Sequence, residues 1–196
     1  MHLISVDEVT GPAAEPVSAT EAKLFCKVDF ADDDTLFTIL IKSARQQVEK
    51  YLNRALITQT LKAYYVNYSN RVYLPYGPHQ SVSSVVRKRR NESETLTVNT
   101  DFYTMGVNQL YLDLEPTGSI NPPGVSQQEA LTNWNLEVEF VAGYGTAGTD
   151  VPQPIKEAIL KIVETNYDNR SNIGSGMVAM PNEAKLLLAP YRVPEI

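Results

Sequence analysis

Few residues in this chain are of the types that carry acid–base or nucleophilic chemistry. The sequence holds two histidines, His2 and His79, and one cysteine, Cys26. A nucleophilic triad needs a histidine that is held by an acidic partner beside a nucleophile, and neither histidine has such neighbours in sequence. A single cysteine excludes an internal disulfide and a tetrahedral cysteine metal site. His79, beside Pro78, is therefore interpreted as an ordinary loop residue. We predict no catalytic residue, no metal ligand and no cofactor site.

Three consecutive aspartates, Asp32, Asp33 and Asp34, form the densest group of carboxylates. Hard cations bind clustered carboxylates, but an EF-hand loop also needs a later glycine and a bidentate glutamate, which are missing here. Acidic side chains at the start of a helix satisfy free amides and complement the helix dipole. We therefore expect the aspartates to begin a helix rather than to bind a metal ion.

The segment from Gly143 to Gly148 formally matches the glycine pattern of dinucleotide-binding folds. In those folds a helix begins at once, so that its amides meet the pyrophosphate. Here Asp150, Pro152 and Pro154 intervene. These glycines are interpreted as a turn between a strand and a helix.

The charges of the chain are mostly dispersed. Seventeen basic residues stand against 23 acidic ones, for a net charge of -6, and a protein that grips nucleic acid needs basic residues in excess over one face. The single dense basic run contains Arg87, Lys88, Arg89 and Arg90. It is expected at the end of a strand, where it contacts DNA phosphates or a neighbouring subunit, or simply stays in water and blunts a sheet edge.

Helical periodicity occurs on both sides of the middle of the chain. Apolar residues spaced by threes and fours predict a long helix over about 33–53, with the stripe Leu36, Ile39, Leu40, Ala44, Val48, Tyr51 and Leu52. A second helix is predicted over about 154–169, after two prolines. Ser18 and Glu21 have the capping-box spacing, which predicts a short helix to about residue 27. A last short helix is expected from Pro181 to Leu188.

The middle of the chain predicts an antiparallel β unit inserted between these helices, so the fold class is α+β. Short runs rich in Val, Leu, Thr and Tyr are separated by turn residues, and they span 56–66, 71–75, 82–90, 94–105, 109–114 and 134–142. We expect one domain over 1–196. It begins with an arm at 1–17, has a helical core at 18–55 and 152–189, and ends with a tail at 190–196. A β insertion at 56–142 interrupts the core and carries a long loop at 115–133. Neither a signal peptide nor a membrane span is predicted.

Several segments, in order along the chain, resemble the head–tail connector (adaptor) proteins of tailed bacteriophages. The first are Pro16-Val-Ser-Ala-Thr-Glu-Ala-Lys23 and Val48-Glu-Lys-Tyr-Leu-Asn-Arg-Ala-Leu-Ile-Thr-Gln-Thr60. Leu74-Pro-Tyr-Gly-Pro and Gln80-Ser-Val-Ser-Ser-Val85 follow. The later segments are Val138-Glu-Phe-Val-Ala-Gly-Tyr-Gly145, Val151-Pro-Gln-Pro-Ile-Lys-Glu-Ala-Ile159 and Leu188-Ala-Pro-Tyr-Arg-Val193. The ordered set, rather than any one segment, carries the resemblance.

The resemblance implies a structural protein without enzymatic activity. Such subunits form a ring, in this family twelve-fold, on the portal protein, extend the DNA channel and provide a docking surface for a stopper or tail-completion protein. Genomic DNA passes through without specific binding. The implied location is the neck of the virion, after synthesis in the host cytoplasm. A cofactor and a membrane partner are not implied.

The resemblance also assigns the C-terminal segment to portal binding, and the residues are Leu186, Leu187, Leu188, Pro190, Tyr191, Arg192 and Val193. Aromatic and Arg side chains are common interface anchors, although Leu187 and Tyr191 would also serve to hold the last helix on the monomer core. Glu137 and Glu139, on the wet face of their predicted strand, are candidates for the channel lumen. Alternative functions are another ring-forming virion component, such as a stopper or tail terminator, or a small hydrolase.

Overall fold

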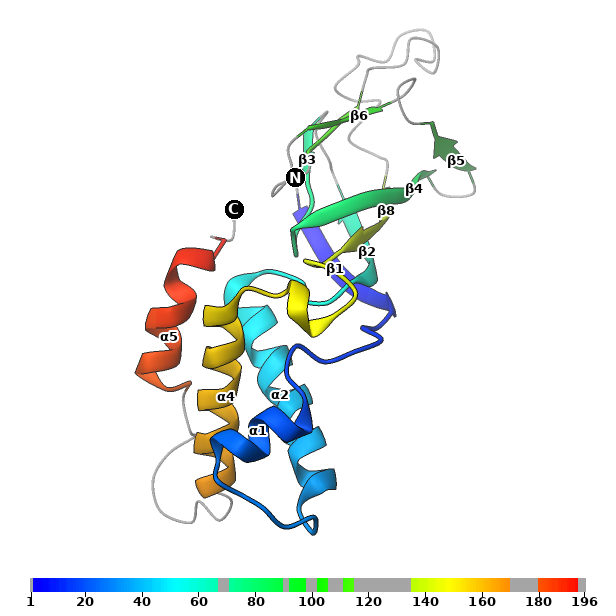
Figure 1. Cartoon of the computed structure of the whole chain (residues 1–196). Coiled ribbons are helices and arrows are strands. Elements are labelled where there is room, and N and C mark those ends of the chain that lie inside the picture. Colours follow the sequence, from blue (N-terminus) through cyan, green and yellow to red (C-terminus); the bar gives the residue numbers. More distant parts are fainter. Residues whose placement is uncertain are drawn as a thin grey trace, which may run out of the picture. The chain divides into compact units, whose positions relative to one another are not determined.

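The computed structural model describes residues 2–66, 71–89, 92–97, 102–105, 111–114, 135–169 and 180–193. The fold is α+β, as the sequence predicted. Contacts divide the chain into two compact units. The helical unit contains Pro12–Ile57 and Tyr144–Ile196, and the β unit contains Met1–Gly11 and Thr58–Gly143. The β unit therefore corresponds to the predicted insertion together with the N-terminal residues (Figure 1).

The helical unit is built around α4. Its elements are α1 (Ala19–Phe25), α2 (Asp34–Leu52), the short 3-10 helix η1 (Gly148–Asp150), α4 (Gln153–Asp168), α5 (Asn182–Leu188) and the 3-10 helix η2 (Ala189–Tyr191). α4 packs against α1, α2 and α5, and Figure 1 shows it between α2 and α5. No helix within the described ranges is long and apolar enough to cross a membrane.

The predicted capping box begins α1. The amide of Glu21 donates to Ser18 Oγ at 3.1 Å, and Glu21 Oε2 accepts from the amide of Ser18 at 2.7 Å. Both interactions satisfy amides that have no partner inside the helix. The backbone hydrogen bond from Ser18 is the largest of the effects that lower the pKa of Glu21.

The core of the helical unit lies between α2 and α4. α2 contributes Phe37, Ile41, Ala44, Val48 and Leu52, and α4 contributes Ile155, Ala158, Ile159, Ile162, Val163 and Tyr167. The rings of Phe37 and Tyr167 stack with their centroids 4.8 Å apart. The prediction was wrong for Ile39, which is 60% exposed. Two residues along a helix correspond to a rotation of about 200°, so Ile39 faces away when Phe37 faces the core.

The β unit contains two antiparallel sheets. The strands are β1 (His2–Thr10), β2 (Gln59–Val66), β3 (Arg71–Tyr73), β4 (His79–Arg89), β5 (Glu92–Leu96), β6 (Phe102–Met105), β7 (Tyr111–Leu114) and β8 (Asn135–Ala142). The larger sheet has the order β1-β2-β8-β4-β5 and the smaller one β3-β7-β6. The predicted antiparallel β unit is confirmed, while the predicted loop 115–133 lies outside the described residues.

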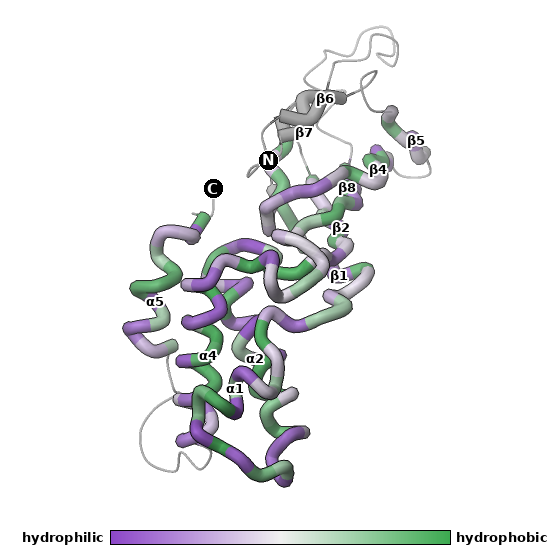
Figure 2. Tube along the Cα trace, in the orientation of Figure 1, coloured by the Kyte–Doolittle hydropathy of each residue, from purple (hydrophilic) through white to green (hydrophobic). Residues whose placement is uncertain are grey.

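Alternating burial along β2 and β8 gives the larger sheet one dry face. Leu61, Ala63 and Tyr65 of β2 are buried, as are Leu136, Val138 and Phe140 of β8. The intervening residues are only half-buried. Figure 2 shows hydrophobic and hydrophilic residues mixed along these strands. The period of two places the polar side chains, including Glu137 and Glu139, on the opposite face.

The prediction of an N-terminal arm over residues 1–17 was wrong for its first part. Residues His2–Thr10 form β1, which pairs with β2 in antiparallel register. The backbone groups of β2 offer a ladder of hydrogen-bond partners that only the folded sheet creates. Local sequence therefore did not identify this pairing.

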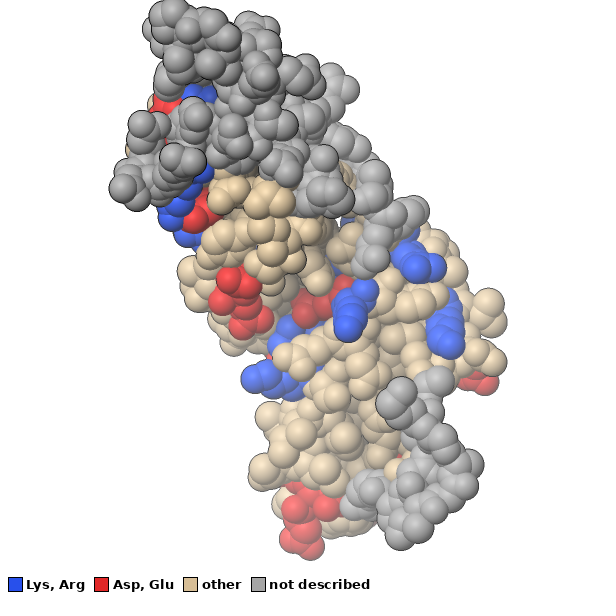
Figure 3. All heavy atoms as spheres, turned by 180° about the vertical axis from the view of Figure 1, so that it is seen from behind, with Lys and Arg blue, Asp and Glu red and all other residues tan. Residues whose placement is uncertain are grey.

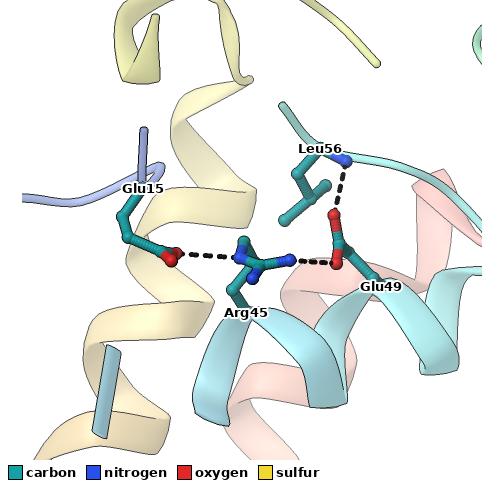
Figure 4. A network of polar contacts seen from close by, with 4 residues as sticks. All are labelled: Glu15, Arg45, Glu49 and Leu56. Atoms are coloured by element: carbon teal, nitrogen blue, oxygen red, sulfur yellow. Dashed lines mark hydrogen bonds and ion pairs between the residues drawn. The ribbon is translucent and has the colours of Figure 1, made fainter. Parts of the chain in front are cut away.

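A buried ion network holds the segments of the helical unit that lie next to its junctions with the β unit. Arg45 of α2 donates from Nε to Glu15 Oε2 at 2.8 Å and from Nη1 to Glu49 Oε2 at 2.6 Å (Figure 4). The other oxygen of Glu49 accepts the amide of Leu56 at 3.0 Å. The side chain of Arg45 is only 3% exposed. Burial is the largest influence on Glu49 and raises its pKa, although Arg45 and the amide of Leu56 oppose it.

Backbone contacts extend this network to the third junction. The amide of Tyr144 donates to the carbonyl of Leu56 at 3.1 Å, and Ile57 forms a parallel bridge with Gly145. A Cβ at Gly148 would lie 2.7 Å from the carbonyl oxygen of Pro16, so this close approach requires glycine. The chain crosses between the units next to Gly11, Ile57 and Gly143, and each crossing is thus anchored within the helical unit.

We expect Arg45→Met to destabilise the helical unit by about 3 kcal/mol, because it leaves the buried carboxylate of Glu49 without its cation. The double variant Arg45→Met/Glu49→Gln should regain most of this loss, since Gln is neutral and still accepts the amide of Leu56. Urea unfolding followed by far-UV circular dichroism measures both. As a control, Lys156→Met removes the partly exposed pair with Glu21 and should cost about 0.5 kcal/mol. A double variant no more stable than the single one would contradict the prediction.

We expect Phe37→Ala to cost about 3–5 kcal/mol in unfolding free energy, because it opens a cavity against Tyr167. The matched control is Ile39→Ala on the same helix, which removes an exposed side chain and should change stability by less than about 0.5 kcal/mol. If both variants lost the same unfolding free energy in chemical denaturation, the wrong face of α2 would have been assigned to the core.

Candidate assembly surface

The three leucines at the end of α5 have different environments. Leu186 is 75% exposed, Leu187 is half-buried, and Leu188 is completely buried in the core of the helical unit. The side chain of Ala184, one turn before Leu188, is also buried. Leu188 therefore holds α5 on the unit, while Leu186 projects into solvent.

The residues after α5 are fixed to the C-terminal end of α2. The amide of Val193 donates to the carbonyl of Leu52 at 3.0 Å, and Arg54 Nε donates to the carbonyl of Tyr191 at 2.6 Å. The guanidinium of Arg192 lies 5.3 Å from the ring centroid of Tyr51, within cation–π distance. Val193 is buried.

These contacts divide the predicted portal-binding residues into two groups. Leu188 and Val193 are buried, and Leu187 and Tyr191 are half-buried against the core. The exposed residues, which we call the C-terminal face, are Leu186, Pro190 and Arg192. Leu187 and Tyr191 thus pack against the core of the helical unit, whereas Leu186, Pro190 and Arg192 are exposed. Residues 194–196 of the predicted tail lie outside the described residues.

The basic run is tied into the larger sheet. Arg87 is buried and forms an ion pair with Glu94 of β5, with Nη2 and Oε2 2.5 Å apart. Lys88 Nζ lies 2.6 Å from Glu137 Oε1 on β8. Arg89 is the last residue of β4, and Arg90 lies outside the described residues. Arg87 and Lys88 therefore already bind carboxylates of the neighbouring strands.

Glu137 lies between two lysines. Its other oxygen, Oε2, is 2.9 Å from Lys62 Nζ on β2. Burial raises the pKa of Glu137, but the hydrogen bonds from Lys88 and Lys62 outweigh it and lower the pKa overall. Glu139 follows on the same face and is opposite Lys62 in the register. The wet face of the sheet thus carries ion pairs rather than carboxylates alone.

The aspartates at the start of α2 join elements of the helical unit. The hydroxyl of Tyr167 donates to Asp33 Oδ2 at 2.6 Å, and Lys23 Nζ lies 2.5 Å from Asp34 Oδ1. The aspartates begin a helix, as expected, with Asp33 at the N-cap and Asp34 as the first residue of α2, but the side chain of Asp33 makes no capping hydrogen bond. Asp33 instead contacts α4, and Asp34 contacts α1. Within the described ranges, no group of three His, Cys, Asp or Glu is arranged to hold a metal ion.

The glycine-rich segment forms the predicted turn between β8 and α4. Gly143 has a φ of 135°, a backbone conformation that only glycine adopts readily, and its amide donates to the carbonyl of Pro78 at 2.9 Å. Asp150 Oδ2 accepts the amide of Ala147 at 3.0 Å. The turn leads into η1 before α4 begins at Gln153.

His79 and Cys26 occupy packed positions. His79 is not a loop residue, as the sequence suggested, but the first residue of β4. It is buried, with Nε2 3.0 Å from the carbonyl of Pro75 and its ring centroid 5.4 Å from that of Phe140. For Cys26, burial, Glu164 and Asp168 raise the pKa of the thiol to about 11, so it stays protonated at neutral pH.

Sequence reasoning missed the apolar side chains that the folded units leave in solvent. On the helical unit Leu24 is 79% exposed, and Phe30 is also exposed. On β1 the exposed apolar residues are Leu3, Ile4 and Val9. For β1, the sequence did contain a signal, because the β-branched residues in 4–9 are typical of a strand. In Figure 3, charged side chains of both signs occur in small groups among uncharged atoms on the face that is seen.

Solved structures with a similar fold are chains of gene transfer agent particles. A chain of the virion of the native gene transfer agent particle has a TM-score of 0.72 and 17% identity, and covers 98% of this chain and 97% of its own. A chain of the neck of the empty particle, with C6 symmetry, gives the same values. A chain of the neck of the native particle, with C12 symmetry, has a TM-score of 0.66, 16% identity and the same coverage. No curated protein sequence matches this chain.

The family comparison concerns the first half of the chain. Residues 18–110 match the family of phage gp6-like head-tail connector proteins. The matched range contains α1, α2 and strands β2 to β6. It includes most of the first segment on which the resemblance was based and all of the next three. The match confirms that this chain resembles the phage head–tail connector family.

Proposed function

We propose that this chain is a structural subunit of a phage-type virion neck, where copies assemble into a ring between the head and the tail. The observation that carries the proposal is the agreement of two comparisons. Residues 18–110 match a head–tail connector family, and a chain in the neck of the empty gene transfer agent particle shares the fold over 98% of this chain. Twelve copies are the number we propose, since a related neck has C12 symmetry.

The arrangement of exposed apolar residues supports a role in assembly. Each unit leaves large apolar side chains in solvent, and burying such side chains between subunits drives association. A head-to-tail ring needs two different surfaces on each copy. The two units provide separate sets of exposed apolar residues, on β1 and on the helices.

We assign the C-terminal face to portal docking. Leu186 supplies exposed apolar area, and Arg192 adds a cation that is already positioned over Tyr51. Interface anchors are most effective when their free conformation is already ordered, and the hydrogen bonds of Tyr191 and Val193 to the end of α2 supply that order. The buried Leu188 fixes α5 behind this face.

For the basic run and the lumen residues, the ion pairs of the sheet support one choice among the alternatives left by the sequence. Arg87 and Lys88 already bind Glu94 and Glu137, which favours a structural or inter-subunit role of the basic run over phosphate binding. Glu137 and Glu139 remain the residues that we assign to the lumen, through which DNA passes without specific binding. A stopper or tail-completion protein binds the ring on the side away from the portal.

The rival assignments have less support. A stopper or tail terminator is expected to be β-rich, whereas α2 and α4 form the core of one unit here. For a hydrolase, the support is weaker than for a structural role, because the family match is to head–tail connector proteins and the similar fold is found in a neck structure.

We expect Leu186→Asp to reduce incorporation of this protein into particles about tenfold or more, because a docked apolar side chain is replaced by a charge that must be desolvated. Electron microscopy of the particles and quantification of the protein per head measure the effect. Filled heads without the ring and without tails are the expected result. Truncation after Ala189 should give the same phenotype.

The control is Glu183→Ala on the same helix, which removes only the exposed pair with Lys161 and should leave incorporation unchanged. Both point variants should unfold like the wild type, which circular dichroism checks. Normal tailed particles from Leu186→Asp would overturn the assignment of the C-terminal face. Absence of this protein from wild-type particles would overturn the proposed function itself.

A further inference from the structure

Three cations lie at the C-terminal end of α2, and we call them the cationic end: Lys50, Arg54 and Arg192. Lys50 is exposed in the last turn of the helix, and Arg54 follows the helix. Arg192 reaches the same end because the amide of Val193 donates to the carbonyl of Leu52. The fold therefore brings together positive charges that are far apart in sequence.

Both arginines of the cationic end are held in place by neutral groups. Arg54 Nε donates to the carbonyl of Tyr191 at 2.6 Å, and its guanidinium also hydrogen-bonds the side chain of Tyr144. Burial is the largest influence on Tyr144 and raises the pKa of its hydroxyl, which stays neutral at neutral pH. The guanidinium of Arg192 lies 5.3 Å from the ring centroid of Tyr51. These contacts order the two side chains without neutralising their charges.

Within the described residues, none of the three cations forms an ion pair. Four other cations of the helical unit do bind carboxylates, and the pairs are Lys23 with Asp34, Arg45 with Glu15 and Glu49, Lys156 with Glu21, and Lys161 with Glu183. The carbonyls at the end of α2 supply only about half an elementary charge of opposite sign. The cationic end therefore keeps a positive excess.

Aromatic and apolar groups lie beside these charges. Leu186 and Pro190 of the C-terminal face are exposed, and Tyr51 and Tyr191 are half-buried. Arg and Tyr side chains beside apolar area are typical of protein interfaces, where they often carry most of the binding energy. A planar guanidinium binds a carboxylate through two parallel hydrogen bonds, which fixes the orientation of the partner. This combination of groups fits an acidic protein surface.

We propose that the cationic end binds Asp or Glu side chains of the portal protein, so that the C-terminal face docks through ion pairs as well as through its apolar groups. The inference rests on the portal docking of the proposed function and adds the chemistry of the partner. Arg192 is the main anchor, because its position over Tyr51 lowers the entropic cost of binding. Lys50 adds a second ion pair, and Arg54 holds the segment that carries Arg192.

Carboxylates of a protein fit the cationic end better than the phosphates of DNA. The net charge of the chain is -6, which repels DNA as a whole. Three cations release few counterions, so they would bind a phosphate backbone only weakly. The exposed side chains of Leu186 and Pro190 supply apolar area that a protein partner can bury and a phosphate backbone cannot.

Binding to DNA-filled, tailless heads tests the proposal, with heads taken from the phage of this protein after deletion of its gene. Purified full-length chain is added, and the bound amount is measured by sedimentation over a range of NaCl concentrations. We expect Arg192→Gln to weaken binding about tenfold and Lys50→Gln about threefold. Each variant should also depend less on salt than the wild type, because an ion pair is lost. Circular dichroism checks that both variants are folded.

The matched control is Lys42→Gln, at an exposed lysine about two turns earlier on α2. It changes the net charge by the same amount and should leave head binding unchanged. Equal weakening by Lys42→Gln and Arg192→Gln would assign the effect to net charge and overturn the proposal.

A water-soluble carbodiimide, which joins amines to carboxylates in direct contact, provides a second measurement. It should link Lys50 to an Asp or Glu of the portal protein in the bound heads, as mass spectrometry of the linked peptides detects. Arg192→Lys places a second reactive amine at the cationic end and should give a further link to the portal. Bound chains without any link from these two positions to a portal carboxylate would overturn the contact.

The same heads separate failure of this inference from failure of the proposed function. If Leu186→Asp prevents binding while Arg192→Gln and Lys50→Gln bind like the wild type, portal docking stands and the acidic partner is overturned. If the wild-type chain does not bind heads at all, portal docking itself is overturned. If heads emptied of DNA lose the binding and free duplex DNA competes for it, the cationic end binds phosphate, which overturns the proposal.

Discussion

The buried Arg45 guanidinium is the interaction on which the organisation of this chain depends. It binds the carboxylates of Glu15 and Glu49, and Glu49 in turn accepts the amide of Leu56. The residues that it joins lie next to two of the three points where the chain crosses between the units, and the backbone contact of Leu56 with Tyr144 adds the third. Desolvating these charges is costly, so the network requires every partner to be present. An ion network at the junctions fixes the ends of the β insertion in the helical unit.

The two units expose apolar side chains by different means. The helical unit buries Leu188 and Val193 and anchors Tyr191 through Arg54, so that Leu186 and Arg192 are held exposed on an ordered segment. The β unit leaves the edge strand β1 without an outer partner among the described strands and bulges it at two apolar residues. For the ring subunit proposed above, exposed apolar groups on ordered segments lower the entropic cost of association.

Local sequence patterns were sufficient to predict most of the helices and strands, but they did not predict what single polar residues contact. The capping box at Ser18 and Glu21 and the alternation in 136–140 gave correct elements because each depends on nearby residues. Asp33 and His79 were misjudged for the opposite reason. Asp33 binds Tyr167, which is 134 residues away in sequence, and the ring of His79 packs on Phe140 of another strand.

The sequence alone determined the α+β class, the long helices, the β insertion and the resemblance to head–tail connectors, since periodicity and ordered segments are properties of the linear chain. The tertiary structure decided that residues 2–10 form a strand, that Ile39 faces solvent while Phe37 faces the core, and that only part of the C-terminal segment is exposed. These features depend on which surfaces pack together. A strand at an edge and a leucine at a helix end have the same local signals whether they are covered or free, and only packing distinguishes the two.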